Sequence, residues 1–203
     1  MRGLAPVVLD IGNVLLRWDP EGLAAHAFLD PEARRRVVEG VLGHPDWIEL
    51  DRGTRSPAEV ADRGARRTGL NRGALLALIE QVPEVLEPIP ETVACAAALA
   101  ARGHPLHLLS NIAAHTWDGV VSRHEFWSHF DVRVLSCHCG AVKPEPAIYR
   151  RLLEDAGLRP GEAVFVDDLP ANVEAGRRAG LRALRFTDPA TSLPALRRLL
   201  DAD

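Results

Sequence analysis

The sequence of 203 residues has few cysteines, and their arrangement excludes several kinds of protein. There are three of them, an odd number, and Cys137 and Cys139 are separated by a single residue, so a disulfide framework is not expected. The triplet Cys137-His138-Cys139 could ligate zinc, but a tetrahedral site needs four ligands, and no second pair has the spacing of a zinc finger. We therefore expect ordinary loop thiols here.

Long apolar runs and a strong charge bias are also missing. No run approaches the roughly 20 apolar residues of a membrane span, and the start, MRGLAPVVLD, turns polar too early for a signal peptide. The net charge of -4 gives no electrostatic footprint for nucleic acid, and the basic cluster at 34–36 is expected on a solvated helix face. These absences predict a cytoplasmic protein without membrane or nucleic-acid partners.

What the chain does contain is a regular alternation of strand-like and helix-like segments. Helical stretches at 90–103, 144–157 and 170–180 each begin with proline and end at glycine. The alternation predicts an α/β fold with a doubly wound, Rossmann-like parallel sheet. Five short apolar runs are the expected strands: 6–10, 106–110, 132–136, 163–167 and 182–186.

The segment between the first two strands breaks this alternation. Residues 17–88 contain no convincing strand but several helix starts, including Asp30-Pro31-Glu32 and the capping box Ser56-Pro57-Ala58-Glu59. We expect a small helical cap at 17–88, inserted into a core formed by residues 1–16 and 89–203. A segment leaving the sheet after the first strand would lie over the carboxyl ends of the strands, where open α/β sheets bind ligands.

Acidic and polar residues follow the predicted strands at points that converge on one edge of a parallel sheet. Two carboxylate positions from different strands suit a hard cation such as Mg²⁺, and a hydroxyl and an ammonium group complement phosphate charge. The combination is typical of phosphoryl transfer. The residues are Asp10, Ser110-Asn111, Lys143-Pro144 and Asp167-Asp168.

Lysine is almost absent, which draws attention to the one that is present. Of the 24 basic residues, Lys143 is the only lysine, and we expect its compact point charge at a helix N-terminus, where a phosphate would bind. Three of the four asparagines, Asn13, Asn111 and Asn172, also fall within these motifs, where short side chains orient loops and carboxylates.

Four motifs in this order resemble the haloacid dehalogenase superfamily over nearly the whole chain, within it the subfamily with a helical cap after the first strand. The Asp-x-Gly-Asn form at Asp10 is similar to bacterial α-glucose-1-phosphatase-like members, which hydrolyse sugar phosphates. The segments that carry the resemblance are 7–15, 109–111, 140–149 and 164–168 with Asn172.

The resemblance implies a Mg²⁺-dependent phosphatase in which an aspartate attacks phosphorus to give an aspartyl-phosphate that water hydrolyses. The expected substrate is a small phosphorylated metabolite, and the expected state is a monomer or small homo-oligomer. The implied roles are Asp10 as nucleophile and metal ligand, the Gly12 carbonyl and Asp168 as further metal ligands, Asp167 acting through water, and Ser110, Asn111 and Lys143 at the phosphate.

The sequence departs from this pattern at Gly12. Most phosphatases of the superfamily carry a second aspartate there, as acid to the leaving group and base to water. Losing such help typically costs about 10²–10⁴-fold, and a sugar 1-phosphate, whose anomeric oxygen leaves easily, would need less of it. A histidine, namely His26, His44 or His115, could substitute.

The cap is expected to choose the substrate. Aromatic faces suit sugars and arginine suits an anionic substituent, so the candidates are Trp18, Trp47 and Arg52, together with His115. Trp47 could equally be core of the cap. Two other functions remain open: a 2-haloacid dehalogenase, which needs no metal and usually has tyrosine at the position of Gly12, or a weak phosphate-ester-binding regulatory protein. The adjacent acids Asp167 and Asp168 argue for a cation.

Overall fold

The five predicted strands form one parallel sheet in the order β3-β2-β1-β4-β5, which confirms the doubly wound α/β fold. The computed structural model describes residues 4–201, so residues 1–3 and 202–203 of the expected core lie outside the described part. In register, Val7 aligns with Leu106 and with Val164, so β1, β2 and β4 end at one edge. The strands are β1 (Val7–Leu9), β2 (Leu106–Ser110), β3 (Val132–Leu135), β4 (Val164–Asp167) and β5 (Arg182–Arg185).

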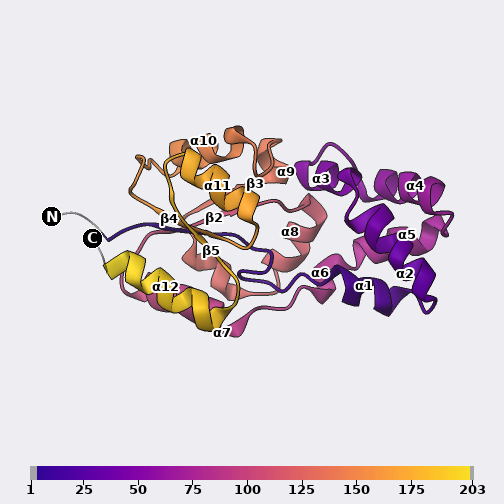
Figure 1. The fold of residues 1–203 in the computed structure, drawn as a ribbon, viewed down its shortest axis with the longest axis horizontal. Helices are drawn as coiled ribbons and strands as arrows, with labels where there is room; N and C mark the ends of the chain where they lie inside the picture. The colour runs from indigo at the N-terminus through magenta and orange to yellow at the C-terminus, as the bar shows by residue number, and fades with distance from the viewer. Residues whose placement is uncertain (1–3, 202–203) are drawn as a thin grey trace.

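Helices cover both faces of this sheet because its central strands, β1, β2 and β4, are buried on both sides. Val7 and Leu9 are buried with one set of core residues, and Val8, between them, with the other. Figure 1 shows α7 (Pro90–Ala101) and α12 (Pro189–Asp201) on one face, and α10 (Pro146–Asp155) and α11 (Pro170–Arg178) on the other. Each fully buried aliphatic side chain contributes about 1.5–3 kcal/mol to this packing.

Shorter helices complete the core beside the longer ones. Trp117 of α8 (Ala114–Val121) packs edge-on against Trp127 of η2, a 3-10 helix (Glu125–His129), with ring centroids 5.2 Å apart. The short helix α9 (Ser136–Cys139) follows β3 without a loop.

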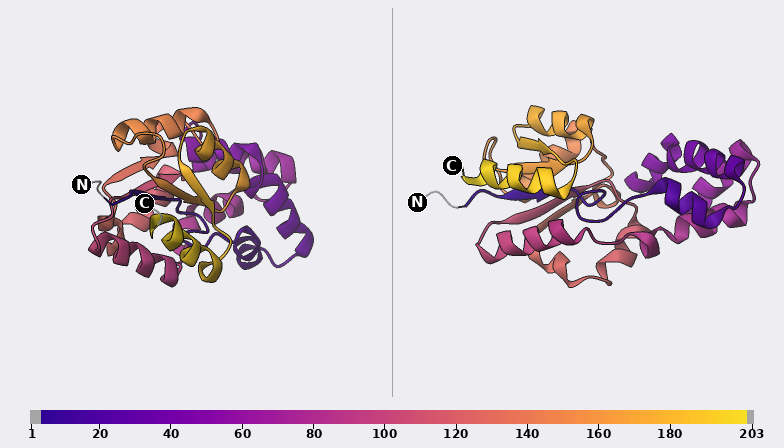
Figure 2. Two further views of the ribbon diagram at one scale, coloured as in Figure 1. Left: turned by 60° about the vertical axis from the view of Figure 1, so that its left-hand side comes forward. Right: turned by 60° about the horizontal axis from the view of Figure 1, so that its bottom comes forward.

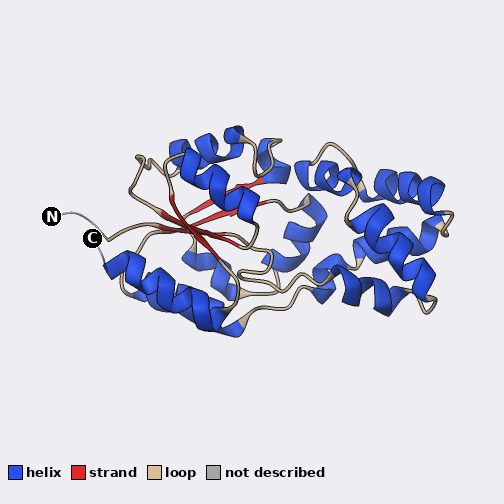
Figure 3. Ribbon diagram, in the orientation of Figure 1, coloured by secondary structure: helices blue, strands red, loops and turns tan. Residues whose placement is uncertain are grey.

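The segment between β1 and α7 is helical in all its regular elements, as expected, and it extends beyond the carboxyl ends of the strands (Figures 1 and 3). Figure 2 shows the same helices set to one side of the sheet in two further orientations. The helices are α1 (Pro20–Ala27), α2 (Pro31–Val37), the π-helical η1 (Val38–Leu42), α3 (Pro45–Arg52), α4 (Pro57–Thr68), α5 (Arg72–Glu80) and α6 (Val82–Val85). None of the helices in residues 4–201 has both the length and the apolar character needed to cross a membrane.

The chain enters and leaves this helical segment at adjacent points. The Arg17 N–H donates to the Glu87 carbonyl at 2.8 Å, and the Ile89 N–H donates to the Leu15 carbonyl at 2.8 Å. We propose this double crossing as the boundary between a cap at 17–88 and the core.

Capping and one buried carboxylate organise the cap. The predicted capping box is present: the Ser56 hydroxyl accepts from the Glu59 N–H, and Glu59 accepts from the Ser56 N–H. The carboxylate of Asp46, on α3, is buried and pairs with Arg63 and Arg67 of α4. Because an unpaired buried charge is costly, these pairs fix α3 against α4.

The structure corrects one expectation about Lys143. The following helix begins at Pro146, not at Pro144, so Lys143 does not lie at a helix N-terminus. Its N–H donates to Asn111 Oδ1 at 2.7 Å, and its carbonyl accepts from Asn111 Nδ2 at 2.9 Å. Because the side chain of Asn111 uses these backbone groups, the lysine is held in a turn ahead of the helix.

Candidate active site

A buried cluster of two carboxylates and one ammonium group lies where β1 and β4 end. Lys143 Nζ is 2.8 Å from Asp10 Oδ1 and 2.6 Å from Asp167 Oδ2. All three side chains are almost fully buried, with exposed fractions of 6% for Asp10, 0% for Asp167 and 3% for Lys143. An unpaired buried charge is costly, so the ammonium group of Lys143 is needed to balance the carboxylates of Asp10 and Asp167.

The protonation of the cluster follows from burial and from these contacts. Burial raises the pKa of Asp10 to about 7, although the charge of Lys143 lowers it in part. For Lys143, burial lowers the pKa, but the charges of Asp10 and Asp167 outweigh that effect and raise it overall. The lysine is therefore an ammonium ion at neutral pH, and the cluster still carries more acid than base.

A third acid extends the cluster and makes it suitable for a cation. Carboxylate oxygens of Asp10, Asp167 and Asp168 all lie within 4.8 Å of one another, which is the one such group of potential metal ligands in residues 4–201. Burial raises the pKa of Asp168, as expected for acids crowded together without a cation. Hard cations such as Mg²⁺ prefer carboxylate oxygens, so the residues present fit a divalent ion. Cys137 and Cys139 are not part of this group.

Neighbouring amides hold these acids in place. Asn172 Nδ2 donates to both oxygens of Asp167, at 3.0 and 3.1 Å. Asn13 Nδ2 donates to Asp168 at 3.1 Å, and Asn13 Oδ1 accepts from the Trp18 N–H at 3.0 Å. Asn13 has a φ of 54°, a left-handed conformation that asparagine tolerates better than most residues. The expectation that asparagines orient the motif carboxylates holds for both.

Ser110 ends β2 beside the nucleophile candidate. Its side chain is 1% exposed, and its Oγ lies close enough to Asp10 to lower the pKa of that carboxyl slightly, yet it makes no well-formed hydrogen bond to any described residue. A buried hydroxyl without a partner normally has a ligand or water to bind. Asn111 also lines the cavity, and both atoms of its amide bond to the backbone of Lys143. It therefore positions the lysine, and the second N–H of its amide is left for the predicted phosphate contact.

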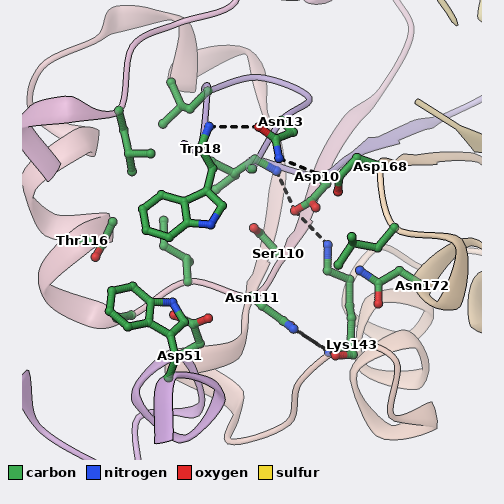
Figure 4. Close-up of a pocket in the computed structure, with 18 of the residues that line it drawn as sticks. Asp10, Asn13, Trp18, Asp51, Ser110, Asn111, Thr116, Lys143, Asp168 and Asn172 are labelled. Carbon is green, nitrogen blue, oxygen red and sulfur yellow. Dashed lines mark hydrogen bonds and ion pairs between the residues drawn. The ribbon is translucent and has the colours of Figure 1, made fainter. Parts of the chain in front are cut away.

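Asp10, Lys143 and Asp168 form the floor of a cavity of about 310 Å³ between cap and core, and Asp167 lies buried beneath it. Figure 4 shows the polar groups of the core on one side and two indole rings on the other. The rings belong to Trp18 and Trp47, which stack with centroids 5.7 Å apart and planes 25° from parallel. Most of the remaining wall is apolar, and its members include Leu16, Ile48, Val82, Leu86 and Ile112.

Comparison with known proteins assigns this arrangement to a family. The model of the haloacid dehalogenase-like hydrolases matches residues 7–180, which covers all four motifs. The chain belongs to this hydrolase family. A sesquiterpene phosphatase of Aspergillus oryzae is 24% identical to this hydrolase over 193 residues, 95% of each chain. Several other curated relatives are matched over less than half of their length.

Solved structures share the fold of this hydrolase. A haloacid dehalogenase family enzyme of Bacteroides thetaiotaomicron, in complex with magnesium and inorganic phosphate, superposes with a TM-score of 0.68 at 21% identity, over 91% of this chain and 95% of that one. The L-2-haloacid dehalogenase of Xanthobacter autotrophicus, with chloropropionic acid covalently bound, has a TM-score of 0.69 at 21% identity, over 98% and 83%. At this identity the likeness establishes the fold alone.

Two of the predicted specificity residues of this hydrolase line the cavity, and two do not. Trp18 and Trp47 are in its wall, but Arg52 forms a bidentate ion pair with Glu145 of the core, with both N···O distances 2.8 Å. Its guanidinium is thus occupied at the junction of cap and core. His115 Nε2 lies 3.2 Å from the Ile79 carbonyl, outside the cavity wall. Both predictions of a direct substrate contact are corrected.

The other two histidines suggested as substitutes for the missing aspartate also lie outside the cavity wall. His26 is exposed on α1, and His44 caps α3 by accepting a hydrogen bond from the Asp46 N–H at 3.1 Å. Neither is placed to exchange a proton with a molecule bound above the acidic cluster.

Sequence reasoning missed the apolar wall and two polar residues that line the cavity, Asp51 and Thr116. Asp51 lies one helical turn after Trp47 on α3 and is 9% exposed. Residues four apart share a helix face, so the prediction for Trp47 carried the signal for Asp51 as well. Its neighbour Arg52 gives the stronger chemical signal in the sequence, because arginine has a high affinity for anions.

Proposed function

We propose that this hydrolase is a magnesium-dependent phosphatase acting on a small phosphate monoester. The observation that carries the proposal is the convergence of Asp10, Ser110, Lys143 and Asp168 at the floor of one cavity, with Asp167 directly beside them. A nucleophile, a cation site and phosphate-binding groups are the parts that phosphoryl transfer needs.

In this proposal Asp10 is the nucleophile. One of its oxygens attacks phosphorus, the bond to the leaving oxygen breaks, and the resulting aspartyl-phosphate is hydrolysed by water. Lys143, 2.8 Å from that carboxylate, offsets the repulsion between the nucleophile and its anionic target. The unpartnered Ser110 hydroxyl donates to a phosphoryl oxygen, and the Lys143 ammonium attracts another.

The metal would be held by Asp10, Asp168 and the Gly12 carbonyl, with Asp167 acting through water. When bound, Mg²⁺ supplies charge neutralisation for the phosphoryl oxygens. Support comes from the raised pKa of both Asp10 and Asp168, since a nearby cation would offset the cost of their burial.

The cap, more than the core, determines which organic group the substrate carries on its phosphate. The leaving-group argument at Gly12 favours a sugar 1-phosphate, but the wall formed by Trp18, Trp47 and Ile48 is apolar and offers few hydrogen bonds to sugar hydroxyls. The Aspergillus oryzae relative is named for a sesquiterpene substrate. We therefore favour an apolar organic group and retain a hexose 1-phosphate as its competitor.

The proposal is tested by phosphate release from a panel that contains a hexose 1-phosphate, a prenyl phosphate and an aryl phosphate, with Mg²⁺ and with EDTA. We expect Mg²⁺-dependent release by wild type and a loss of at least about 10³-fold in Asp10→Asn, because an amide cannot serve as the nucleophile. The matched control is Asp131→Asn, the same chemical change at an exposed position.

Other outcomes point to the remaining functions. Halide release from 2-haloacids without metal would replace the phosphatase with a dehalogenase, whose known member shares the fold. Binding of phosphate esters without turnover would indicate a regulatory protein. A panel with no release at all, or release that persists in Asp10→Asn, contradicts the proposal.

A further inference from the structure

Position 12 leaves the proposed reaction without an acid on the core side of the cavity. A Cβ atom built at Gly12 would meet no other atom within 4 Å, so the space that an acidic side chain could fill is open. An alkoxide leaving group needs a proton, and general acid help of this kind contributes about 10²–10⁴-fold. The proton donor must therefore come from another wall of the cavity.

The cavity wall contains one such group. Its titratable members among the described residues are Asp10, Lys143, Asp168 and Asp51, and the first three are already engaged in the acidic cluster and its lysine. Asp51 belongs to the cap. In Figure 4, Asp51 and Asp10 lie on opposite sides of the cavity. An in-line attack by Asp10 expels the leaving group on the side away from it, which is the side of Asp51.

The main chain around Asp51 is fixed to the core. Its carbonyl accepts from the Ser136 hydroxyl at 2.6 Å, and the next residue, Arg52, forms the bidentate pair with Glu145. Gly53 then turns with a φ of 82°, and a Cβ atom there would lie 3.1 Å from the Cys137 carbonyl. A catalytic group must be held to within a fraction of an ångström, and these contacts provide that restraint.

We propose that Asp51 is the general acid and base of this enzyme, supplied by the cap in place of the aspartate missing at position 12. The inference rests on the proposed phosphatase function. As the bond between phosphorus and the leaving oxygen breaks, its electron pair stays on that oxygen, which takes the Asp51 proton. The Asp51 carboxylate then takes a proton from the water that attacks the aspartyl-phosphate and releases the Asp10 carboxylate.

The protonation of Asp51 suits this role. Burial raises its pKa to about 7, while a hydrogen bond from the Ala113 N–H lowers it in part. The charged groups that act on it are Asp10, directly after β1, which raises the pKa, and Lys143, which lowers it. Burial raises the pKa of the Cys137 thiol of α9, and the Asp51 charge adds to that rise. At neutral pH both the acid and its conjugate base are populated, which a group that donates and then accepts a proton needs.

The test compares two substrates that differ in their need for a proton. The leaving group of p-nitrophenyl phosphate, an aryl ester, is a stable anion. The leaving group of hexyl phosphate is an unstable alkoxide unless a general acid protonates it. For Asp51→Asn we expect kcat/KM to fall by about 10²-fold or more on hexyl phosphate and by less than about 10-fold on p-nitrophenyl phosphate. Above pH 7, the decline of kcat/KM for hexyl phosphate in wild type should be absent in the variant.

Two further variants separate catalysis from structure. Gly12→Asp, introduced into the Asp51→Asn background, places a carboxyl in the open space of the core and should restore at least about 10-fold of the lost activity on hexyl phosphate. Asp131→Asn is the exposed control and should behave as wild type. Retained inhibition by inorganic phosphate shows that the site of Asp51→Asn is still assembled.

Equal losses on both substrates, or no loss on either, would overturn the role of Asp51 while leaving the phosphatase standing. A wild type inactive on every phosphate ester would overturn the proposed function itself, and with it this inference. Support for both proposals is a loss of kcat/KM in Asp51→Asn that is selective for hexyl phosphate and is restored by Gly12→Asp.

Discussion

Replacing Asp51 by asparagine should make the folded protein more stable above neutral pH. The carboxylate is buried in a largely apolar wall, and its pKa is raised from the usual 3.8 to about 7. The folded protein therefore binds the Asp51 proton more tightly than the unfolded chain does. At about 1.36 kcal/mol per pKa unit, the rise costs wild type about 4 kcal/mol of folding free energy at high pH.

The pH dependence has a definite sign. Well below the unfolded pKa of 3.8 the carboxyl is protonated in both states, and the cost is absent. It grows as the pH rises from about 4 to about 7 and then stays constant. Asparagine has no charge to bury and can still accept the hydrogen bond from Ala113, so the variant avoids the cost throughout. The stabilisation of Asp51→Asn over wild type should grow from about 0.5 kcal/mol at pH 4 to about 4 kcal/mol at pH 8.

Urea unfolding of both proteins at pH 4, 6 and 8, in EDTA, measures this difference directly. The neighbouring acids Asp10 and Asp168 titrate in both proteins, so their effects largely cancel. A difference independent of pH, or a variant less stable than wild type at pH 8, would refute the assignment of Asp51 as a buried acid with a raised pKa. Asp131→Asn, at the surface, should show no comparable trend.

Three further perturbations address other contacts. Lys143→Met leaves two buried carboxylates without their counter-charge, so we expect a loss of about 3–5 kcal/mol in urea unfolding at pH 7 and a smaller loss at pH 4; an equal loss at both would argue against the charge explanation. Arg52→Gln removes the ion pair to Glu145 and should lower global stability by less than about 1 kcal/mol while speeding amide exchange at the end of α3, and unchanged exchange would show that other contacts hold the cap. Trp47→Ala should raise KM for a prenyl phosphate at least about tenfold more than for acetyl phosphate, whereas equal changes would mean that the indole supports the cap and not the substrate.

The core was predictable because parallel strands have a strong local signature. Both faces of β1 and β4 are buried, so these strands read as continuous apolar runs, and proline and glycine mark the helices between them. The start of α10 was misplaced because Pro144 resembles a helix start, while the contact that prevents it, from Asn111 to Lys143, spans 32 residues. No local pattern reports a contact of that kind.

In the candidate site, too, the residues from the core were predictable from the sequence and those from the cap were not. Residues at strand ends converge because sheet geometry requires it, and Asp10, Lys143 and Asp167 are in contact as the order of motifs implied. The cap has no such geometric constraint, since a helix can rotate its polar residues toward the core or into the cavity. Arg52 points to the core and its neighbour Asp51 to the cavity. Periodicity puts Asp51 on the face of Trp47, but it does not say which face of the helix meets the cavity.

Asn13 links the acidic cluster of the core to the cavity wall formed by the cap. One end of its amide holds Asp168, and the other holds the main chain at Trp18, in the wall of the cavity. A cation that draws Asp168 toward itself acts on the same side chain as a ligand that presses on the indole. Thermodynamic linkage is reciprocal, so any effect of the bound cation on the affinity for the ligand equals the effect of the ligand on the affinity for the cation. The affinity for metal, measured with and without an unreactive ligand in the cavity, would then depend on what the cap has bound.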